Sequence, residues 1–300
     1  MVIDFIGKRK ISIIISMIII IAGLFSLMFQ GLNMGIDFVG GTKYMLQFSE
    51  PVSSESIRQV LAEHQLEGSY IQATENNQFI IRTLTLSEGD SEQLIRDFNT
   101  RFGSIEVLSN EVVSSVISSE LKEKAFIAVI VASILMLIYI AFRFELSFAV
   151  AAIIALLYDM LITLSFFSLL QIEINSSFIA ALLTIIGYSI NDTIVIFDRI
   201  RENLLFKQKE TLNNLVNRSI NQSIIRSINT SITSIVVLLA LLLLGGETTK
   251  VFALAMIIGF SSGTYSSIFI ASPAWLEIKK RGFGKDYSKK SKKAVPVTDK

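Results

Sequence analysis

The stretch FIAALLTIIGYSINDTIVIF, residues 178–197, is long enough to cross a lipid bilayer as a single helix. It nevertheless carries an ionisable side chain, Asp192, close to its end. A carboxylate at membrane depth costs roughly a few kcal/mol even on lenient insertion scales, so it is expected to face protein or water and to mark an ion pathway. The stretch therefore predicts a membrane helix built around a functional acid.

The composition of the 300 residues places the whole chain in the same class. Apolar residues make up 51% of it and the mean hydropathy is +0.58, far above the values typical of soluble domains. The absence of cysteine excludes a disulfide framework, a thiolate metal site and a cysteine nucleophile. The single histidine, His64, lies in a polar stretch and is expected to be a solvated helix residue. We expect an integral membrane protein that uses no metal and no other cofactor.

Six apolar runs are long enough to form transmembrane helices. They cover residues 11–29, 125–142, 146–170, 178–197, 224–244 and 251–271. The first run follows the basic cluster Lys8-Arg9-Lys10 but is too long for the apolar region of a signal peptide, so we expect it to be retained as a span. Because the number of spans is even, both termini lie on one side of the membrane.

Basic residues are distributed unevenly among the short segments that join these spans. Three segments assigned to one side are basic, namely the N-terminal segment 1–10, the linker 201–220 and the tail 274–300. The short loops on the opposite side contain a single basic residue, Lys250. The positive-inside rule therefore predicts that both termini are cytoplasmic. Apolar residues recur on one side of the linker 201–220, which predicts an amphipathic helix lying on the cytoplasmic surface.

Residues 31–123, between the first span (11–30) and the second, have the composition of a small water-soluble domain. Strand-like and helix-like patterns alternate there in the order βαββαβ, which suggests a two-layer, ferredoxin-like fold. The strands are expected at 43–48, 70–74, 78–83 and 105–108, with one helix after Ser53 and another around 94–102. The predicted fold class is thus a six-span helical membrane protein, with an extracytoplasmic α+β domain at 31–123 and a five-span bundle at 124–273.

The entrance of the fifth span is unusually polar and carries Arg226 at a depth similar to that of Asp192, which lies ~8 Å inside the membrane. Helical spacing places Tyr188 on the face of Asp192, with Asn191 next to it, and Thr230 on the face of Arg226, so these three residues are expected to support a polar path. An arginine stays charged at every relevant pH, so protonation of the acid can alternate with its pairing to the arginine. The alternative is a static ion pair near the headgroups, with polar residues that pack the spans together.

Two further features lie in the third and sixth spans. Asp159 is an acid nearer the midplane, and it is either a second proton-coupling residue or a polar packing contact. Gly259 and Gly263 belong to a series of small residues that recur every fourth position in the sixth span and that also includes Ser267. Such a seam is expected to let another helix approach closely.

The segment GIDFVGG follows the first span and contains Gly35, Asp37, Phe38, Gly40 and Gly41. Its glycines do not have the spacing of a phosphate-binding loop, so nucleotide binding is not expected. Positive-φ turns at the start of a strand explain them more simply. Hydrolytic motifs are also absent from the sequence, so we expect no enzyme, and an energy source in the membrane gradient or in a separate ATPase.

Three stretches together resemble the SecF-type subunits of the SecD/SecF family, which belongs to the bacterial Sec protein-export machinery. They are GIDFVGG at 35–41, GYSINDTIVIFDRIREN at 187–203, and the polar run around Arg226. The family's functional acid and arginine fall on Asp192 and Arg226. In the third span this chain has Tyr158-Asp159 where many relatives have His-Asp, so no imidazole relay is expected.

The resemblance implies half of an RND-type transporter that pairs with a SecD-like subunit in the bacterial inner membrane. It also implies association with the SecYEG channel and SecA, and contact with exported preproteins and the lipid bilayer, with no nucleic-acid partner. Its implied role is to assist the late, extracytoplasmic steps of protein export with the proton gradient. Two alternatives remain open, a structural subunit that stabilises the translocon without proton transport, and half of an RND-type exporter of small molecules or lipids.

Overall fold

The computed structural model describes residues 3–74, 76–205 and 210–282. The chain forms two compact units. One is a helical bundle, made of Met1–Asn33 and Ile127–Lys300, and the other is a smaller α+β unit, Met34–Phe126. Each unit is described separately below.

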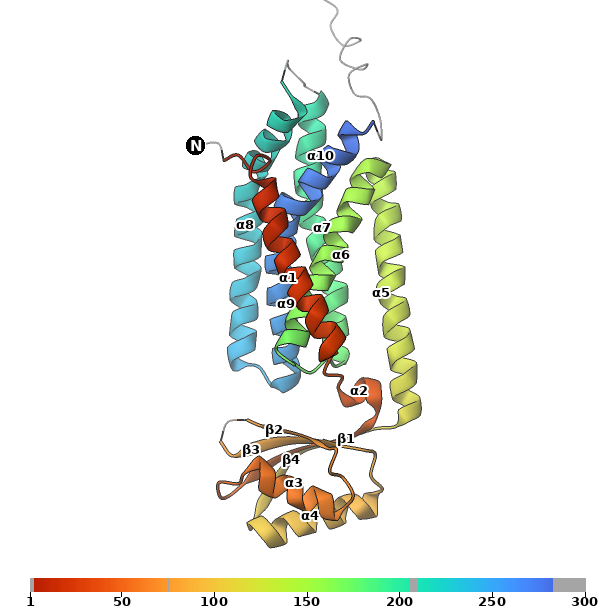
Figure 1. Cartoon of the computed structure of the whole chain (residues 1–300), viewed down its shortest axis with the longest axis vertical. Helices are drawn as coiled ribbons and strands as arrows, with labels where there is room; N and C mark the ends of the chain where they lie inside the picture. The colour runs from red at the N-terminus through yellow and green to blue at the C-terminus, as the bar shows by residue number, and fades with distance from the viewer. Residues whose placement is uncertain (1–2, 75, 206–209, 283–300) are drawn as a thin grey trace, which may run out of the picture. The chain divides into compact units, whose positions relative to one another are not determined.

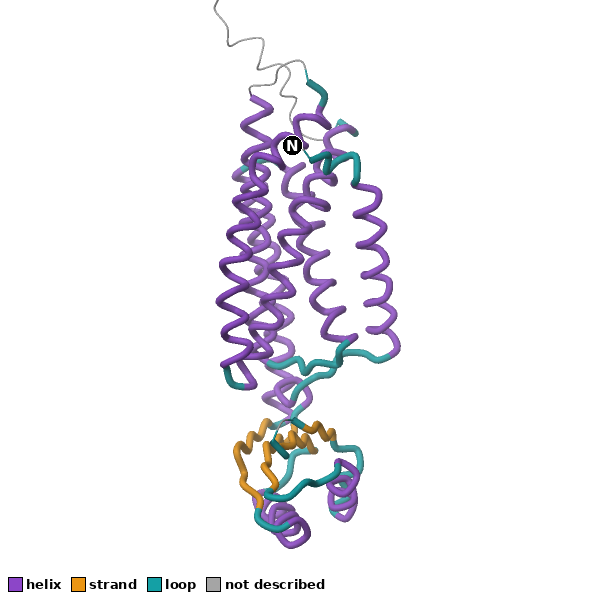
Figure 2. The backbone as a smooth tube through the Cα atoms, turned by 90° about the vertical axis from the view of Figure 1, so that its left-hand side faces the viewer, coloured by secondary structure: helices purple, strands orange, loops and turns teal. Residues whose placement is uncertain are grey.

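The smaller unit contains a four-stranded antiparallel sheet with the strand order β2-β3-β1-β4. Helices α3 and α4 both cover the same face of this sheet (Figures 1 and 2). This topology confirms the predicted βαββαβ, ferredoxin-like arrangement. The elements are β1 (Gly41–Phe48), α3 (Ser54–Glu63), β2 (Tyr70–Ala73), β3 (Gln78–Thr83), α4 (Glu88–Phe102) and β4 (Ile105–Val113).

The core of this unit lies between the sheet and its two helices. Alternate residues of β1, Tyr44, Leu46 and Phe48, are fully or almost fully buried against α3 and α4. Both helices begin at a serine whose side chain accepts a backbone N–H, as expected for an N-cap. His64 was expected to be solvated, but its Nε2 lies 2.8 Å from Asp97 Oδ2, which ties the end of α3 to α4.

The glycine-rich segment 35–41 leads into strand β1. Gly35 precedes the short helix α2 (Ile36–Val39), in which Phe38 is buried. Gly40 and Gly41 have φ values of +76° and +132°, as predicted for positive-φ turns. A Cβ atom on Gly41 would lie 2.3 Å from the carbonyl oxygen of Thr83, so no larger residue fits without movement of the backbone.

Six helices of the described residues are long and apolar enough to cross a membrane, which confirms the six-span prediction. They are α1 (Arg9–Phe29), α5 (Ser115–Arg143), α6 (Leu146–Leu169), α7 (Ser176–Leu205), α8 (Leu212–Leu244) and a final helix. The final helix consists of α9 (Glu247–Ser266), the π-helical turn η1 (Ser267–Ala271) and α10 (Ser272–Lys280).

The centre of the bundle is formed by α6, α7 and the final helix. At least half of the apolar window of each of these helices is buried, against 22% for α1, 17% for α8 and 6% for α5. Figure 1 shows α1 crossing in front of the central helices, with α8 on the opposite side of the bundle from α5. The intramembrane polar residues on α6, α7 and α9 therefore lie in the part of the bundle that is most enclosed by protein.

The structure differs from the predictions at the end of the bundle where α7, α8 and α10 meet. Residues 201–220 do not form a separate surface helix, because 201–205 continue α7 and 212–220 begin α8, while 206–209 lie outside the described residues. The apolar residues Leu215, Val216 and Ile220 are completely buried in the bundle, which explains the difference. The expected tail 274–300 begins as helix α10, where Trp275 stacks on Phe148 at 4.8 Å between ring centroids. Residues 283–300 are not described.

Candidate functional site

Asp192 lies on α7 inside the bundle, and only 7% of its surface is exposed. The Ser267 hydroxyl of η1 donates a hydrogen bond of 3.0 Å to its Oδ2. The buried Ser227 hydroxyl of α8 lies beside the same carboxyl group. Asp192 therefore faces protein hydroxyl groups rather than lipid, as an acid at this depth requires.

Arg226 lies on α8 near Asp192, close enough for an electrostatic interaction. Within the described part of the chain, no ion pair of 4.0 Å or less joins the two side chains, and Arg226 is exposed on the surface of this chain. The face of α8 that packs inward runs through Ser227 and Ser231, one position away from the predicted face through Arg226 and Thr230. Serine is small enough to allow close helix packing, whereas a guanidinium is not.

The three residues predicted to support a polar path have different surroundings. The Tyr188 ring stacks on Phe260 at 3.5 Å, and its hydroxyl donates to Ser231 Oγ at 3.3 Å. Asn191 is exposed, and so is Thr230, whose hydroxyl donates to the Arg226 carbonyl of its own helix at 2.9 Å. The structure thus joins Tyr188 to α8 and α9 and leaves the other two on the outer surface of the chain.

Asp159, on α6, is completely buried. Three serine hydroxyls donate to its carboxyl group, Ser189 of α7 at 2.5 Å and Ser262 and Ser266 of α9 at 2.5 and 2.8 Å. These hydrogen bonds occupy most of the acceptor sites of a carboxylate. Asp159 therefore connects the three central helices of the bundle.

The two acids are linked through neighbouring residues at the start of the π-helical turn. Ser266 donates to Asp159 and Ser267 donates to Asp192, so a single peptide segment contacts both carboxyl groups. Sequence reasoning missed these serines, because it assigned position 267 to a packing seam. The run SSGTYSS, residues 261–267, carried the signal, since it is the most hydroxyl-rich part of the sixth span.

Gly259 and Gly263 of α9 lie against α7. A Cβ atom on Gly259 would lie 2.3 Å from Ile185 Cδ1, and one on Gly263 would lie 3.2 Å from Ser189 Cβ. The two glycines therefore allow the close approach that brings Ser262, Ser266 and Ser267 within hydrogen-bond distance of the acids.

The arrangement is suited to proton uptake and release. A carboxyl group accepts or releases a proton, and a serine hydroxyl can both donate and accept a hydrogen bond, so the network can rearrange without leaving a polar group unpaired. Within the described residues, no group of three or more His, Cys, Asp or Glu side chains is placed to hold a metal ion. The hydrogen-bond donors to both carboxyl groups are serine hydroxyls of the bundle.

Comparisons with known proteins place this arrangement in a family. The model of the SecD/SecF protein-export membrane protein C-terminal region matches residues 93–281, and that of the SecD/SecF GG motif matches residues 25–52. The chain is 39% identical over 271 residues to the protein translocase subunit SecF of Sebaldella termitidis, covering 88% of each chain. It is 42% identical to the SecF subunit of Acidaminococcus fermentans, covering 89% of this chain and 94% of that one.

The crystal structure of SecDF from Thermus thermophilus, a translocon-associated membrane protein, is similar to the fold described above. The TM-score is 0.86 and the sequence identity is 38% over 93% of this chain. The match covers only 39% of that SecDF chain, so this chain corresponds to part of it. From the family models, the relatives and the shared fold together, we conclude that the chain belongs to the SecD/SecF family of protein-export membrane proteins.

Proposed function

We propose that this chain is a SecF-type subunit that uses the proton gradient to assist the late, extracytoplasmic steps of protein export. The observation that carries the proposal is the buried carboxyl group of Asp192, which lies inside a membrane bundle beside a permanent cation, Arg226. In the proposed cycle, ionised Asp192 attracts Arg226 toward α7. Protonation removes that attraction and leaves the Ser267 hydroxyl as the main partner of the acid.

The energy available is sufficient to bias such a change. One elementary charge that crosses a potential of 100 mV releases ~2.3 kcal/mol, which shifts a two-state equilibrium by about fiftyfold. Movement of α8 relative to α7 is the step that this energy would drive, because Arg226 is on α8 and its side chain is not fixed by an ion pair to Asp192 in this structure. Asp159 is proposed as a second protonation site, coupled to the first through the neighbouring serines of the final helix.

A second subunit is expected to cover the polar strip on α7 and α8. Asn191, Arg226, Asn229, Thr230 and Thr233 are exposed on this chain, although they lie in helices that cross the membrane. Polar groups at that depth are expected to face protein or water rather than lipid. A SecD-like half fits this role, because the similar Thermus thermophilus structure is a SecDF chain of which this chain covers about two fifths.

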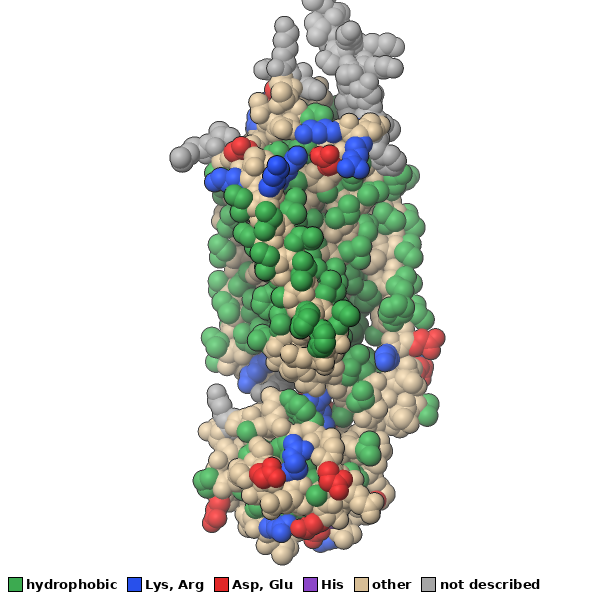
Figure 3. All heavy atoms as spheres, in the orientation of Figure 1, with side chains coloured by type: hydrophobic (Ala, Val, Ile, Leu, Met, Phe, Trp, Pro, Cys, Tyr) green, Lys and Arg blue, Asp and Glu red, His purple; other side chains and the backbone are tan. Residues whose placement is uncertain are grey.

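The wider assembly follows from the same proposal. The partners would be the SecYEG channel, SecA and exported preproteins, in the bacterial inner membrane. Basic residues gather at the end of the bundle that contains Arg9, Arg199, Arg201, Lys279 and Arg281 (Figure 3). By the positive-inside rule that end, with both termini, is cytoplasmic, and the α+β unit between the first two spans is extracytoplasmic.

The test is export of a preprotein into vesicles that contain the translocon and this chain with its SecD-like partner, with and without a proton gradient. Asp192→Asn and Arg226→Ala are expected to abolish the part of the export rate that depends on the gradient. Asp198→Asn is the matched control, because it makes the same substitution on the same helix at a side chain that pairs with Arg201 at 3.0 Å. Full gradient-dependent export by Asp192→Asn would instead support the role of a structural subunit.

A further inference from the structure

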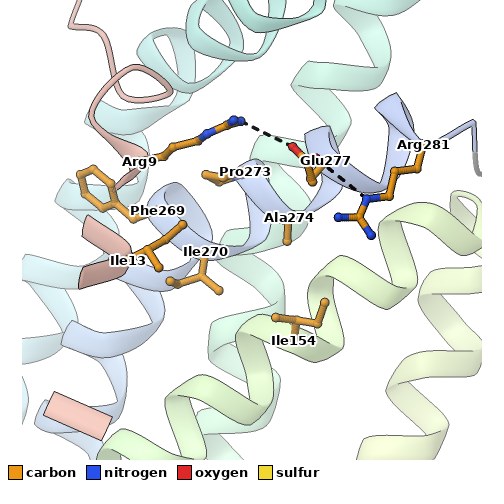
Figure 4. A pocket seen from close by; sticks show the side chains of 9 residues that line it. All are labelled: Arg9, Ile13, Ile154, Phe269, Ile270, Pro273, Ala274, Glu277 and Arg281. Atoms are coloured by element: carbon orange, nitrogen blue, oxygen red, sulfur yellow. Dashed lines mark ion pairs between the residues drawn. The ribbon is translucent and has the colours of Figure 1, made fainter. Parts of the chain in front are cut away.

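A groove lies on the surface of the bundle between α1, α6 and the final helix (Figure 4). It is near the end of the bundle at which α1 begins and α10 ends. Its volume is roughly 520 Å³, within the range of small-molecule sites. The wall is mostly apolar and consists of Ile13, Ile154, Phe269, Ile270, Pro273 and Ala274. Phe269 and Ile270 belong to the π-helical turn η1, a kind of irregularity that is frequent at functional sites.

Charged side chains lie only at one end of this groove. Arg9 and Arg281 both approach the carboxylate of Glu277, at 3.8 and 3.9 Å. These distances are too long for hydrogen bonds, so the guanidinium groups keep donors for another acceptor. Two arginines and one glutamate also leave a net charge of +1 at this end, which matches an anion.

The groove therefore has the polarity of a phospholipid. On α1, Ile13 lies one helical turn farther into the membrane than Arg9, and on α10 Pro273 and Ala274 lie one turn before Glu277. Figure 4 shows the same order, with the ion pairs across one end and the apolar side chains below them. Basic pockets between transmembrane helices bind anionic headgroups, and arginine binds phosphate with paired donors.

We propose that this groove binds one anionic glycerophospholipid of the leaflet on the side of the termini. An acyl chain lies along Ile13, Ile154 and Ile270, and the phosphate accepts hydrogen bonds from Arg9 and Arg281. A lipid with one net negative charge neutralises the +1 charge of the groove, whereas a zwitterionic lipid does not. The lipid would contact η1 directly and so lie next to the segment that holds both carboxyl groups. This inference does not depend on the proposed proton coupling.

Trp275 offers a direct measurement, because it is the only tryptophan of the chain and directly follows Ala274 of the groove. Its fluorescence is measured for the full chain in phosphatidylcholine vesicles that contain brominated phosphatidylglycerol or, in a parallel series, brominated phosphatidylcholine. Bromine quenches tryptophan only at short range. For one net charge we expect an apparent affinity about fivefold higher for phosphatidylglycerol than for phosphatidylcholine.

Two pairs of variants separate a specific site from general surface charge. Arg9→Gln with Arg281→Gln is expected to remove the preference, whereas Lys10→Gln with Lys280→Gln makes the same change of charge at adjacent residues that do not line the groove and should keep it. Ala274→Phe fills the groove and should reduce quenching while the arginines remain. Equal quenching by both lipids in the natural chain, or an equal loss in both double variants, would overturn the proposal.

Discussion

Replacement of Gly259 by alanine tests the contact between α7 and α9 that places the serines beside the acids. The added Cβ would lie 2.3, 2.4 and 2.9 Å from three side-chain atoms of Ile185, which is completely buried. Because isoleucine is branched at Cβ, rotation about the Cα–Cβ bond of Ile185 keeps at least one γ-carbon near the new methyl group, so the helices must separate. Overpacking of this kind costs about 1–3 kcal/mol, while glycine to alanine within a helix returns about 0.5–1 kcal/mol.

Two other glycines provide controls, because replacing a helical glycine by alanine gives the same gain in helix stability at each position. A Cβ on Gly187 of α7 meets no atom within 4 Å, and one on Gly263 meets Ser189 at 3.2 Å. We expect Gly187→Ala to be the most stable variant, Gly263→Ala to be intermediate and Gly259→Ala to be the least stable. Because the gain in helix stability is the same in both variants, the free energies of unfolding of Gly187→Ala and Gly259→Ala should differ by about 1–3 kcal/mol.

The assay is reversible unfolding of the full chain in mixed micelles, followed by the fluorescence of Trp275, which is buried and stacked on Phe148. A double-mutant cycle with Ile185→Ala isolates the contact, because that variant removes the three atoms that the new methyl group would meet. In the Ile185→Ala background, Gly259→Ala should no longer lower the free energy of unfolding. If Gly259→Ala is as stable as Gly187→Ala, the close contact between these helices is refuted.

Three further predictions concern polar contacts. Ser267→Ala removes the hydroxyl bonded to Asp192 and should lower gradient-dependent export about two- to tenfold, with export in the absence of a gradient unchanged. Asp159→Ala removes the acceptor of three buried serine hydroxyls and should destabilise the bundle by about 1–3 kcal/mol in the unfolding assay; unchanged stability would contradict this set of hydrogen bonds. Hydrogen bonds from the Gly7 N–H and the Asn217 side chain hold the pKa of the Asp4 carboxyl below its ordinary value. The stabilisation from ionised Asp4 is therefore present above about pH 4 and lost as pH falls through the lowered pKa, so the protection factor of the Gly7 amide against exchange should fall only in acid, and in Asp4→Ala it should be low at every pH.

The fold could be predicted from the sequence to a large extent, because local signals and the overall arrangement agree. Serine caps, the Asn76-Asn77 turn with positive φ at both residues, and Gly103 after α4 all lie where the βαββαβ order needs them. The spans were predicted because hydropathy alone defines them. The ends of the helices were not, since α5 begins at Ser115, before the apolar run that marks the membrane.

The surroundings of the candidate site were harder to predict for a physical reason. A helical projection gives the face of an amphipathic helix, but it cannot distinguish Arg226 from Ser227 as the inward residue when both neighbours are polar. Packing decides this, because the small serines allow the helices to approach. The π-helical turn has no sequence signal of its own, so the contact of Ser266 and Ser267 with different acids appears only in three dimensions.

The π-helical turn Ser267–Ala271 also allows the length of the last span to change. A π-helical turn contains more residues than an α-helical turn. If it became α-helical, the residues after Ala271 would rotate about the helix axis by one position and move about 1.5 Å along it. Because Ser267 begins this turn, a change in the hydrogen bond to Asp192 acts where the helix is easiest to rewind. The displacement would reach Trp275 and the basic residues Lys279 and Lys280 of α10, while α9 keeps its place against α7.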